Sequence, residues 1–214
     1  MLSGVVVAGG KFLAKEAVRQ LAITTLTSVR ASVFDASETA SNKEQLSGKE
    51  EEPNVSVDQA VATVRAQAES LPPLSETEWS EKELNSLSED LFAEYLSKSI
   101  YADDDLDDIT PLHNMIPPNE YQIKSDEFTA YVRIQKRNSS VAQLKWSNLQ
   151  TDIATSLQAF EIDPTFTILF TTSSVDELDR VECLANYGVL IFDGDTVRRL
   201  LTDDGLLPPH RNKR

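Results

Sequence analysis

Asp103 to Asp108 carry the densest set of chemically capable side chains in this 214-residue sequence, with five carboxylates in six positions. Carboxylate oxygens are the ligands that hard divalent cations prefer. A calcium-binding loop of the helix–loop–helix type needs ligands at alternate positions, a central glycine and a distal glutamate, and this run lacks that spacing. We therefore expect a solvated acidic loop that repels nucleic acid or contacts a basic partner.

The cysteine and histidine content argues against disulfides and zinc. The single cysteine, Cys183, excludes an internal disulfide and fits a reducing compartment. His113 and His210 lie far apart with no paired thiol, so we expect no zinc site. The chain also lacks a Gly-x-Ser-x-Gly nucleophile motif and a phosphate-binding glycine loop. Cys183 lies among apolar neighbours in a predicted helix, where a structural role is expected.

Polar side chains also recur within the stretch Phe128–Arg137, where apolar and polar residues alternate. The alternating residues are Ala130, Tyr131, Val132, Arg133, Ile134 and Gln135. Period-two alternation predicts a half-buried strand. Without any metal, Arg133, Gln135 and Arg137 form a polar sheet face that pairs with Asp126 or Glu127.

Strands and helices alternate through the rest of this region. The pattern predicts a helix over 141–160, a strand over 165–172, a helix to about 187 and a strand over 188–192, with 121–124 as a hairpin partner of 128–137. Ser174 and Glu177 have capping-box spacing, and Gly188 suits a helix C-terminus. Strand, helix, strand, helix, strand indicates an α/β fold with a parallel sheet.

This order of strands and helices resembles that of a known family. The resemblance rests on the segments Tyr131–Arg137, Thr167–Thr172 and Gly188–Gly194. The order resembles the restriction-endonuclease-like superfamily, particularly its Mrr-type branch. In that branch a strand ending in Gln-x-Lys or Glu-x-Lys leads into a helix, a strand closing on threonines and a strand ending Ile-Asp-Gly. The resemblance covers residues 120–202 and implies a small mixed or parallel sheet with flanking helices.

The resemblance also implies a nuclease site. The family holds a divalent cation between acidic or amide side chains on adjacent strands, and a lysine two positions on orients the attacking water. The matching residues are Asp126 or Glu127 as the upstream acid, Gln135 as the second ligand and Arg137 at the lysine position. Arg137 cannot deprotonate. Taking Lys136 as the lysine instead places Ile134 where a metal ligand belongs, and Lys136 points to the opposite face of a regular strand.

The charge is concentrated in the middle of the chain. Residues 35–118 hold 20 acidic and five basic residues, and the net charge of the whole chain is -15. Such a surface repels a phosphate backbone, which counts against broad nucleic-acid binding. We divide the chain into a possible targeting or amphipathic helix (1–34), a linker (35–57), an acidic helical arm (58–118), an α/β domain (119–202) and a C-terminal tail (203–214).

The first 34 residues have four basic residues and one acidic residue, and they resemble a mitochondrial targeting segment. The alternative is an ordinary amphipathic helix, which leaves a cytoplasmic location open. The apolar run Val5–Ala8 is far below the roughly 20 residues that span a bilayer, so we expect no transmembrane segment.

The arm is expected to be helical. Ser75 and Glu78 have capping-box spacing ahead of a helix to Ser99, whose apolar stripe includes Leu84, Leu91 and Phe92. This stripe packs on the α/β domain or docks on another protein.

Two functions follow from these patterns. The first is a non-catalytic scaffold or interaction subunit without a cofactor, in a mitochondrial assembly, with protein partners bound through the acidic arm. The second is a nuclease that uses Mg²⁺ with Asp126, Gln135, Lys136 and Arg137 as its site.

Overall fold

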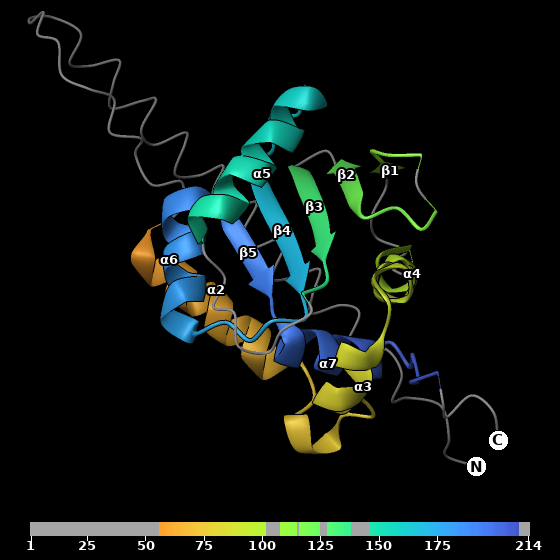
Figure 1. Cartoon of the computed structure of the whole chain (residues 1–214). Helices are drawn as coiled ribbons and strands as arrows, with labels where there is room; N and C mark the ends of the chain where they lie inside the picture. Colours follow the sequence, from red (N-terminus) through yellow and green to blue (C-terminus); the bar gives the residue numbers. More distant parts are fainter. Residues whose placement is uncertain (1–55, 102–107, 115, 125–127, 138–145, 210–214) are drawn as a thin grey trace, which may run out of the picture.

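A five-stranded mixed sheet flanked by helices forms the centre of the protein (Figure 1). The structure is a computed structural model that describes residues 56–101, 108–114, 116–124, 128–137 and 146–209, with 70 and 146–149 described for the backbone only. Its elements are α2 Val57–Ser70, η1 Leu74–Glu76, α3 Glu81–Ser86, α4 Glu89–Tyr101, β1 Asp108–Pro111, β2 Glu120–Lys124, β3 Thr129–Gln135, α5 Trp146–Ala159, β4 Phe166–Thr171, α6 Glu177–Tyr187, β5 Val189–Phe192 and α7 Gly194–Asp203. The α/β prediction is therefore confirmed.

The strands lie in chain order, from β1 to β5. The first three strands pair antiparallel, whereas β3, β4 and β5 run parallel and are joined by α5 and α6. The predicted strand–helix alternation and the hairpin between 121–124 and β3 are both confirmed. Strand β1, which pairs with β2, was not predicted because its four residues carry no period-two pattern.

Strand β3 is buried on both faces. Ala130 and Val132 face the core shared with α4 and α7, and Tyr131 on the opposite face is fully buried with Leu169 and Ile153. Thr129, Arg133 and Gln135 are half-buried, and the other residues of β3 are buried. The predicted half-buried strand is therefore correct in its alternation, but its polar face is covered by α5.

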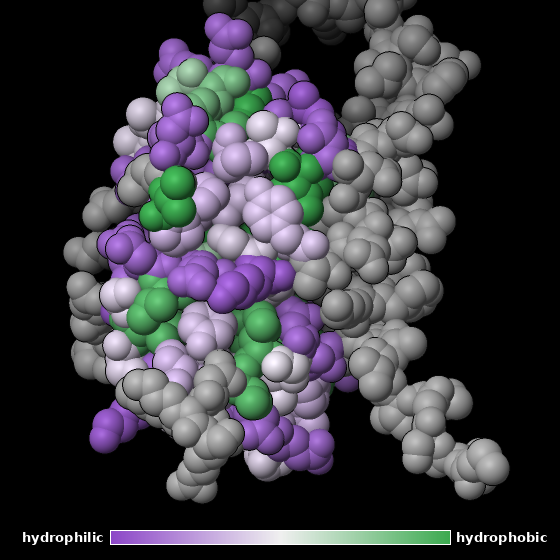
Figure 2. All heavy atoms as spheres, turned by 90° about the vertical axis from the view of Figure 1, so that its right-hand side faces the viewer, coloured by the Kyte–Doolittle hydropathy of each residue, from purple (hydrophilic) through white to green (hydrophobic). Residues whose placement is uncertain are grey.

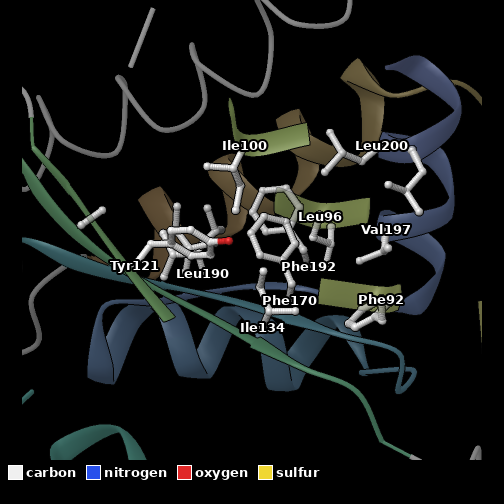
Figure 3. Close-up of a cluster of buried hydrophobic side chains, with 14 of the residues drawn as sticks. Phe92, Leu96, Ile100, Tyr121, Ile134, Phe170, Leu190, Phe192, Val197 and Leu200 are labelled. Carbon is white, nitrogen blue, oxygen red and sulfur yellow. The ribbon is translucent and has the colours of Figure 1, made fainter. Parts of the chain in front are cut away.

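The predicted acidic arm shares one hydrophobic core with the sheet (Figure 3). Members of this core from both regions include Ala60, Val64, Trp79, Phe92 and Leu96 together with Val132, Ile168, Phe170 and Phe192. The apolar stripe of α4 is thus buried within the protein apart from Leu91, which was expected in the stripe and is 40% exposed. Glu89, Asp90 and Glu94 remain on the exposed side of this helix.

Two predicted helix starts are wrong. Ser75 lies in the short turn η1, and the helix after it begins at Ser80, whose hydroxyl accepts from the Glu83 N–H in a complete capping box. Both serines have a glutamate three residues on, so the motif alone does not select between them. The start of α6 is capped by Asp176, which accepts from the Leu178 N–H, and not by Ser174.

The C-terminal ends of these helices also differ from the predictions in part. The predicted single helix 75–99 is divided, since α3 ends at Ser86 and α4 begins at Glu89. Gly188 does end α6, with a φ of 61° and its N–H bonded to the Leu184 carbonyl, as predicted. Tyr187, expected to point inward, is 38% exposed.

Hydrogen bonds from α7 and the residues after it hold the first three helices. Arg199 donates to the carbonyls of Ala68, Leu71 and Pro72, with distances of 2.6 Å to Leu71 and 2.5 Å to Pro72. The Ala68 and Leu71 carbonyls lie at the C-terminal end and cap of α2, where no helical partner is available, and Pro72 follows the cap. In addition, the Trp79 indole N–H donates to the Leu206 carbonyl at 2.6 Å.

In the described part of the chain no helix combines the length and the apolar character that crossing a bilayer requires.

We expect Arg199→Met to lower the free energy of unfolding by about 2 kcal/mol, because it removes charged donors from three carbonyls while keeping an apolar stem. Urea unfolding followed by circular dichroism measures the change. Arg65→Met is the matched control, since the Arg65 side chain is 68% exposed and faces only Glu177 at 3.8 Å. An equal effect in the two variants would contradict the assigned role of Arg199.

Candidate functional site

Glu120, the first residue of β2, is a carboxylate buried to 4% exposure on the face of the sheet that α5 covers. Four side chains from different elements surround it: His113 from the loop before β2, Tyr131 and Arg133 from β3, and Ser156 from α5. We call these five residues the Glu120 cluster. It joins a buried carboxylate to side chains of one loop, one strand and one helix.

Both carboxylate oxygens are occupied. Oε1 accepts from the Tyr131 hydroxyl at 2.7 Å and the Ser156 hydroxyl at 3.1 Å, and the Arg133 Nη1 lies 3.1 Å from it. Oε2 lies 2.6 Å from the His113 Nε2. A carboxylate has about four lone-pair sites, so these contacts use its accepting capacity.

The cluster forms because of strand register. Glu120 lies directly opposite Arg133 in the antiparallel β2–β3 pair, and Tyr131 is two residues from Arg133 on the same face. Helix α5 crosses this face and supplies Ser156 and, 4.0 Å from the Arg133 Nη2, Asp152. The His113 ring packs edge-on against Phe160, with centroids 4.8 Å apart, which fixes the loop beside the cluster.

The surroundings of Glu120 keep it ionised. Burial alone raises the pKa of this carboxyl, but hydrogen bonds from Tyr131, His113 and Ser156 and the positive charge of Arg133 outweigh burial and lower the pKa below its ordinary value. The pKa of Tyr131 is raised, first by burial and then by its contact with the carboxylate. At neutral pH the cluster therefore contains an anion, a guanidinium cation and a neutral phenol.

The residues predicted for a nuclease site are described only in part. Gln135 ends β3, and Lys136 and Arg137 follow it. Asp126 and Glu127 lie outside the described residues. Lys124 and Thr129, which flank them, pair at the opposite end of β3 from Gln135, about 20 Å away at 3.3 Å per residue.

The carboxyl end of β3 is tied to β4. The Thr172 hydroxyl accepts from the Arg137 N–H and donates to the Arg137 carbonyl, both at 2.9 Å. The segments that follow β3 and β4 therefore stay side by side beyond the sheet. Gln135 lies opposite Thr171, and within the described residues its Oε1 is buried without a hydrogen-bond partner. Of the predicted site residues that the structure describes, Gln135 is the one with a buried acceptor left unused.

Other polar groups at this edge have structural roles. Asp193 caps α7 by accepting from the Thr196 N–H at 2.9 Å, and it also accepts from the Val175 N–H at 3.4 Å.

Cys183 is buried, and burial raises the pKa of its thiol to about 12, so it is not a thiolate at neutral pH. The structural role expected for Cys183 agrees with this burial. Among the described residues no group of three or more His, Cys, Asp or Glu side chains has the arrangement of a metal site.

Sequence reasoning missed Glu120 because Pro117, Pro118 and Asn119 indicate a turn at that point. The available signal was the hairpin itself. Pairing Lys124 with Thr129 across the short connection places Glu120 opposite Arg133. A buried carboxylate beside an arginine follows from that register alone.

Comparison of the chain with protein-family models, curated proteins and solved structures found no match.

We expect Glu120→Gln to flatten the dependence of stability on acid pH. A carboxyl whose pKa is lower in the folded state stabilises the protein above its unfolded pKa, near 4.5 here, and this contribution is lost as the pH falls through the folded pKa. At pH 7 the variant should lose roughly 2 kcal/mol, because Arg133 is left without its partner.

Urea unfolding at pH 7 and at pH 3 provides the measurement, and Glu182→Gln, on the exposed side of α6, is the control. The difference between wild type and Glu120→Gln should shrink from pH 7 to pH 3. A difference that stays constant over this range would contradict an ionised Glu120.

Proposed function

We propose that this protein is a non-catalytic α/β scaffold, an interaction subunit of a larger assembly, built on a fold that resembles a restriction endonuclease whose metal site has lapsed. One observation carries the proposal: the Glu120 carboxylate is neutralised by the protein's own Arg133 and by three further contacts.

The resemblance requires an acid on one strand, an acidic or amide ligand on the adjacent strand and a lysine two positions further. By the spacing of the family motif, Gln135 matches the second ligand and Arg137 matches the lysine, so a guanidinium that cannot deprotonate lies at the lysine position. The buried acid on the adjacent strand β2 is Glu120, and the residue directly opposite it is Arg133.

Arginine at this position opposes metal binding electrostatically. A divalent cation bound to Glu120 would lie within a few ångströms of a permanent positive charge. It would also have to displace the hydroxyl and imidazole contacts from the carboxylate oxygens. The network thus supplies to Glu120 the positive charge that a metal supplies in an active relative.

The second candidate is a divalent-metal-dependent nuclease that uses Asp126, Gln135 and Lys136 with Mg²⁺. The buried and unpartnered Oε1 of Gln135 favours it, because an amide oxygen is a suitable ligand for a hard cation.

Incubation of the purified full chain with double-stranded DNA, single-stranded DNA and RNA in the presence of Mg²⁺ or Mn²⁺ separates the two functions. We expect no cleavage above the level of a buffer control, since Arg137 replaces the lysine of the motif and Arg133 already neutralises the buried Glu120. Gel electrophoresis of end-labelled substrates gives the measurement.

Lys136→Ala and Gln135→Ala are the informative variants, and Lys124→Ala, an exposed lysine on β2, is their control. Metal-dependent cleavage that disappears in the first two and persists in the third would establish the nuclease and refute the scaffold. Cleavage retained in all three variants would come from a contaminant.

The interaction role is proposed for the outer surface of the helical arm. The apolar stripe of α4 is buried, so a partner would meet the polar side of α3 and α4. Exposed acidic residues on this side are Glu81, Glu89, Asp90 and Glu94. Their charge favours a partner with a basic surface.

We further propose a mitochondrial location, on the basis of the low-acid first 34 residues. The expected result is that the protein recovered from cells begins after the targeting segment, which Edman sequencing or mass spectrometry of the N-terminal peptide measures. Recovery of a product that begins at Met1 would count against the targeting role.

A further inference from the structure

The acidic run of the sequence leads into the outermost strand of the sheet. Asp108, its last residue, is also the first residue of β1, and β1 pairs with β2 alone. No further strand lies beyond β1 among the described residues. An edge strand presents backbone N–H and C=O groups to which another chain can pair.

The register decides which backbone groups of β1 point outward. The Leu112 N–H donates to the Glu120 carbonyl at 3.0 Å, and in antiparallel pairs the bonded positions alternate. Thr110 and Asp108 therefore also turn their backbone groups toward β2. Ile109 and Pro111 turn theirs away from the sheet.

Pro111 has no N–H, so the outward edge of β1 is asymmetric. It presents one donor, the Ile109 N–H, and two acceptors, the carbonyls of Ile109 and Pro111. A chain that adds to this edge must supply more N–H groups than carbonyls. The side chains of Asp108 and Thr110 are exposed on one face of the strand and joined by a 3.1 Å hydrogen bond.

We propose that β1 is a docking edge for an extended, lysine- or arginine-rich segment of a protein partner, which adds as a sixth strand. The inference rests on the proposed interaction role. Asp108 supplies the negative charge at this edge, and it belongs to a sequence run of five carboxylates within six residues. On the side of the molecule that carries β1, hydrophilic side chains separate small apolar patches (Figure 2). The partner segment would therefore meet a mainly polar surface.

A second copy of this chain does not fit the same edge. Each copy would bring the negative charge of its own Asp108 to the shared edge, and edges of like charge repel one another. Two such edges would also share a shortage of N–H donors, since each carries Pro111 at an outward position. A basic strand from another protein supplies both the charge and the donors.

The test uses a synthetic hexapeptide of sequence Lys-Val-Lys-Thr-Lys-Val with blocked ends, titrated into the ¹⁵N-labelled full chain. We expect shifts of the β1 and β2 amide signals, slower hydrogen exchange of the Ile109 N–H and an affinity that falls with salt. A peptide with glutamate in place of each lysine should bind at least about tenfold more weakly.

Two changes remove the backbone contacts specifically. Ile109→Pro deletes the outward donor without touching the bonds to β2, and it should weaken binding about fivefold or more. Because this variant also loses the packing of Ile109 on the core, a peptide N-methylated at alternate residues serves as a second measurement on the unaltered protein. Asp108→Asn should weaken binding and reduce its salt dependence.

Shifts confined to α3 and α4, or equal binding of the lysine, glutamate and N-methylated peptides, would overturn the docking edge. This result is distinct from failure of the proposed function, which the cleavage assay decides. Absent cleavage together with absent peptide binding would remove the docking edge and leave the scaffold in place.

Discussion

Glu120 places a negative charge inside the protein, where an ion without partners costs several kcal/mol relative to water. The charge is tolerated because β3 brings Arg133 directly opposite, the preceding loop brings His113, and α5 brings Ser156. Each partner comes from a different element, so the register of β2 on β3, the position of α5 and the path of the loop are all fixed by one carboxylate. Slipping the hairpin by one residue would turn Glu120 to the opposite, apolar face.

Apolar side chains predominate on the opposite face of the sheet. There the helices before β1 and the last helix cover Val132, Ile168 and Phe192 with apolar side chains, so burial of hydrocarbon holds this side together. The protein thus combines a polar network that specifies position on one face with non-directional packing on the other. Polar networks of this kind favour a single arrangement only when every member has its partner.

The α/β region was predictable because its patterns are local. The alternation along β3 and the apolar run of β4 identify strands whatever surrounds them, and the glycine after α6 marks a helix end. The start of α3 was not predictable by motif, since two serines have the same spacing to a glutamate. Strand β1 gave no signal, because its four residues include a proline and two polar side chains.

The site was harder to predict than the fold because it depends on pairing between distant residues. Gln135, Lys136 and Arg137 stand out by spacing within one strand, yet their neighbours come from other elements. Glu120 stands out only after the β2–β3 register is known. The burial of the α4 stripe likewise required the tertiary structure, because an amphipathic helix has the same pattern whether it covers its own core or a partner's surface.

The contacts of Arg199 and Leu206 with α2 and Trp79 join residues more than 120 positions apart in sequence. During synthesis the first helices leave the ribosome well before their partners exist, and their apolar sides stay uncovered until α7 has emerged. Contacts of such long sequence separation form late, after a large loop has closed. Throughout that interval the nascent polypeptide exposes apolar helix faces, which are the kind of surface that promotes aggregation of a partly folded chain.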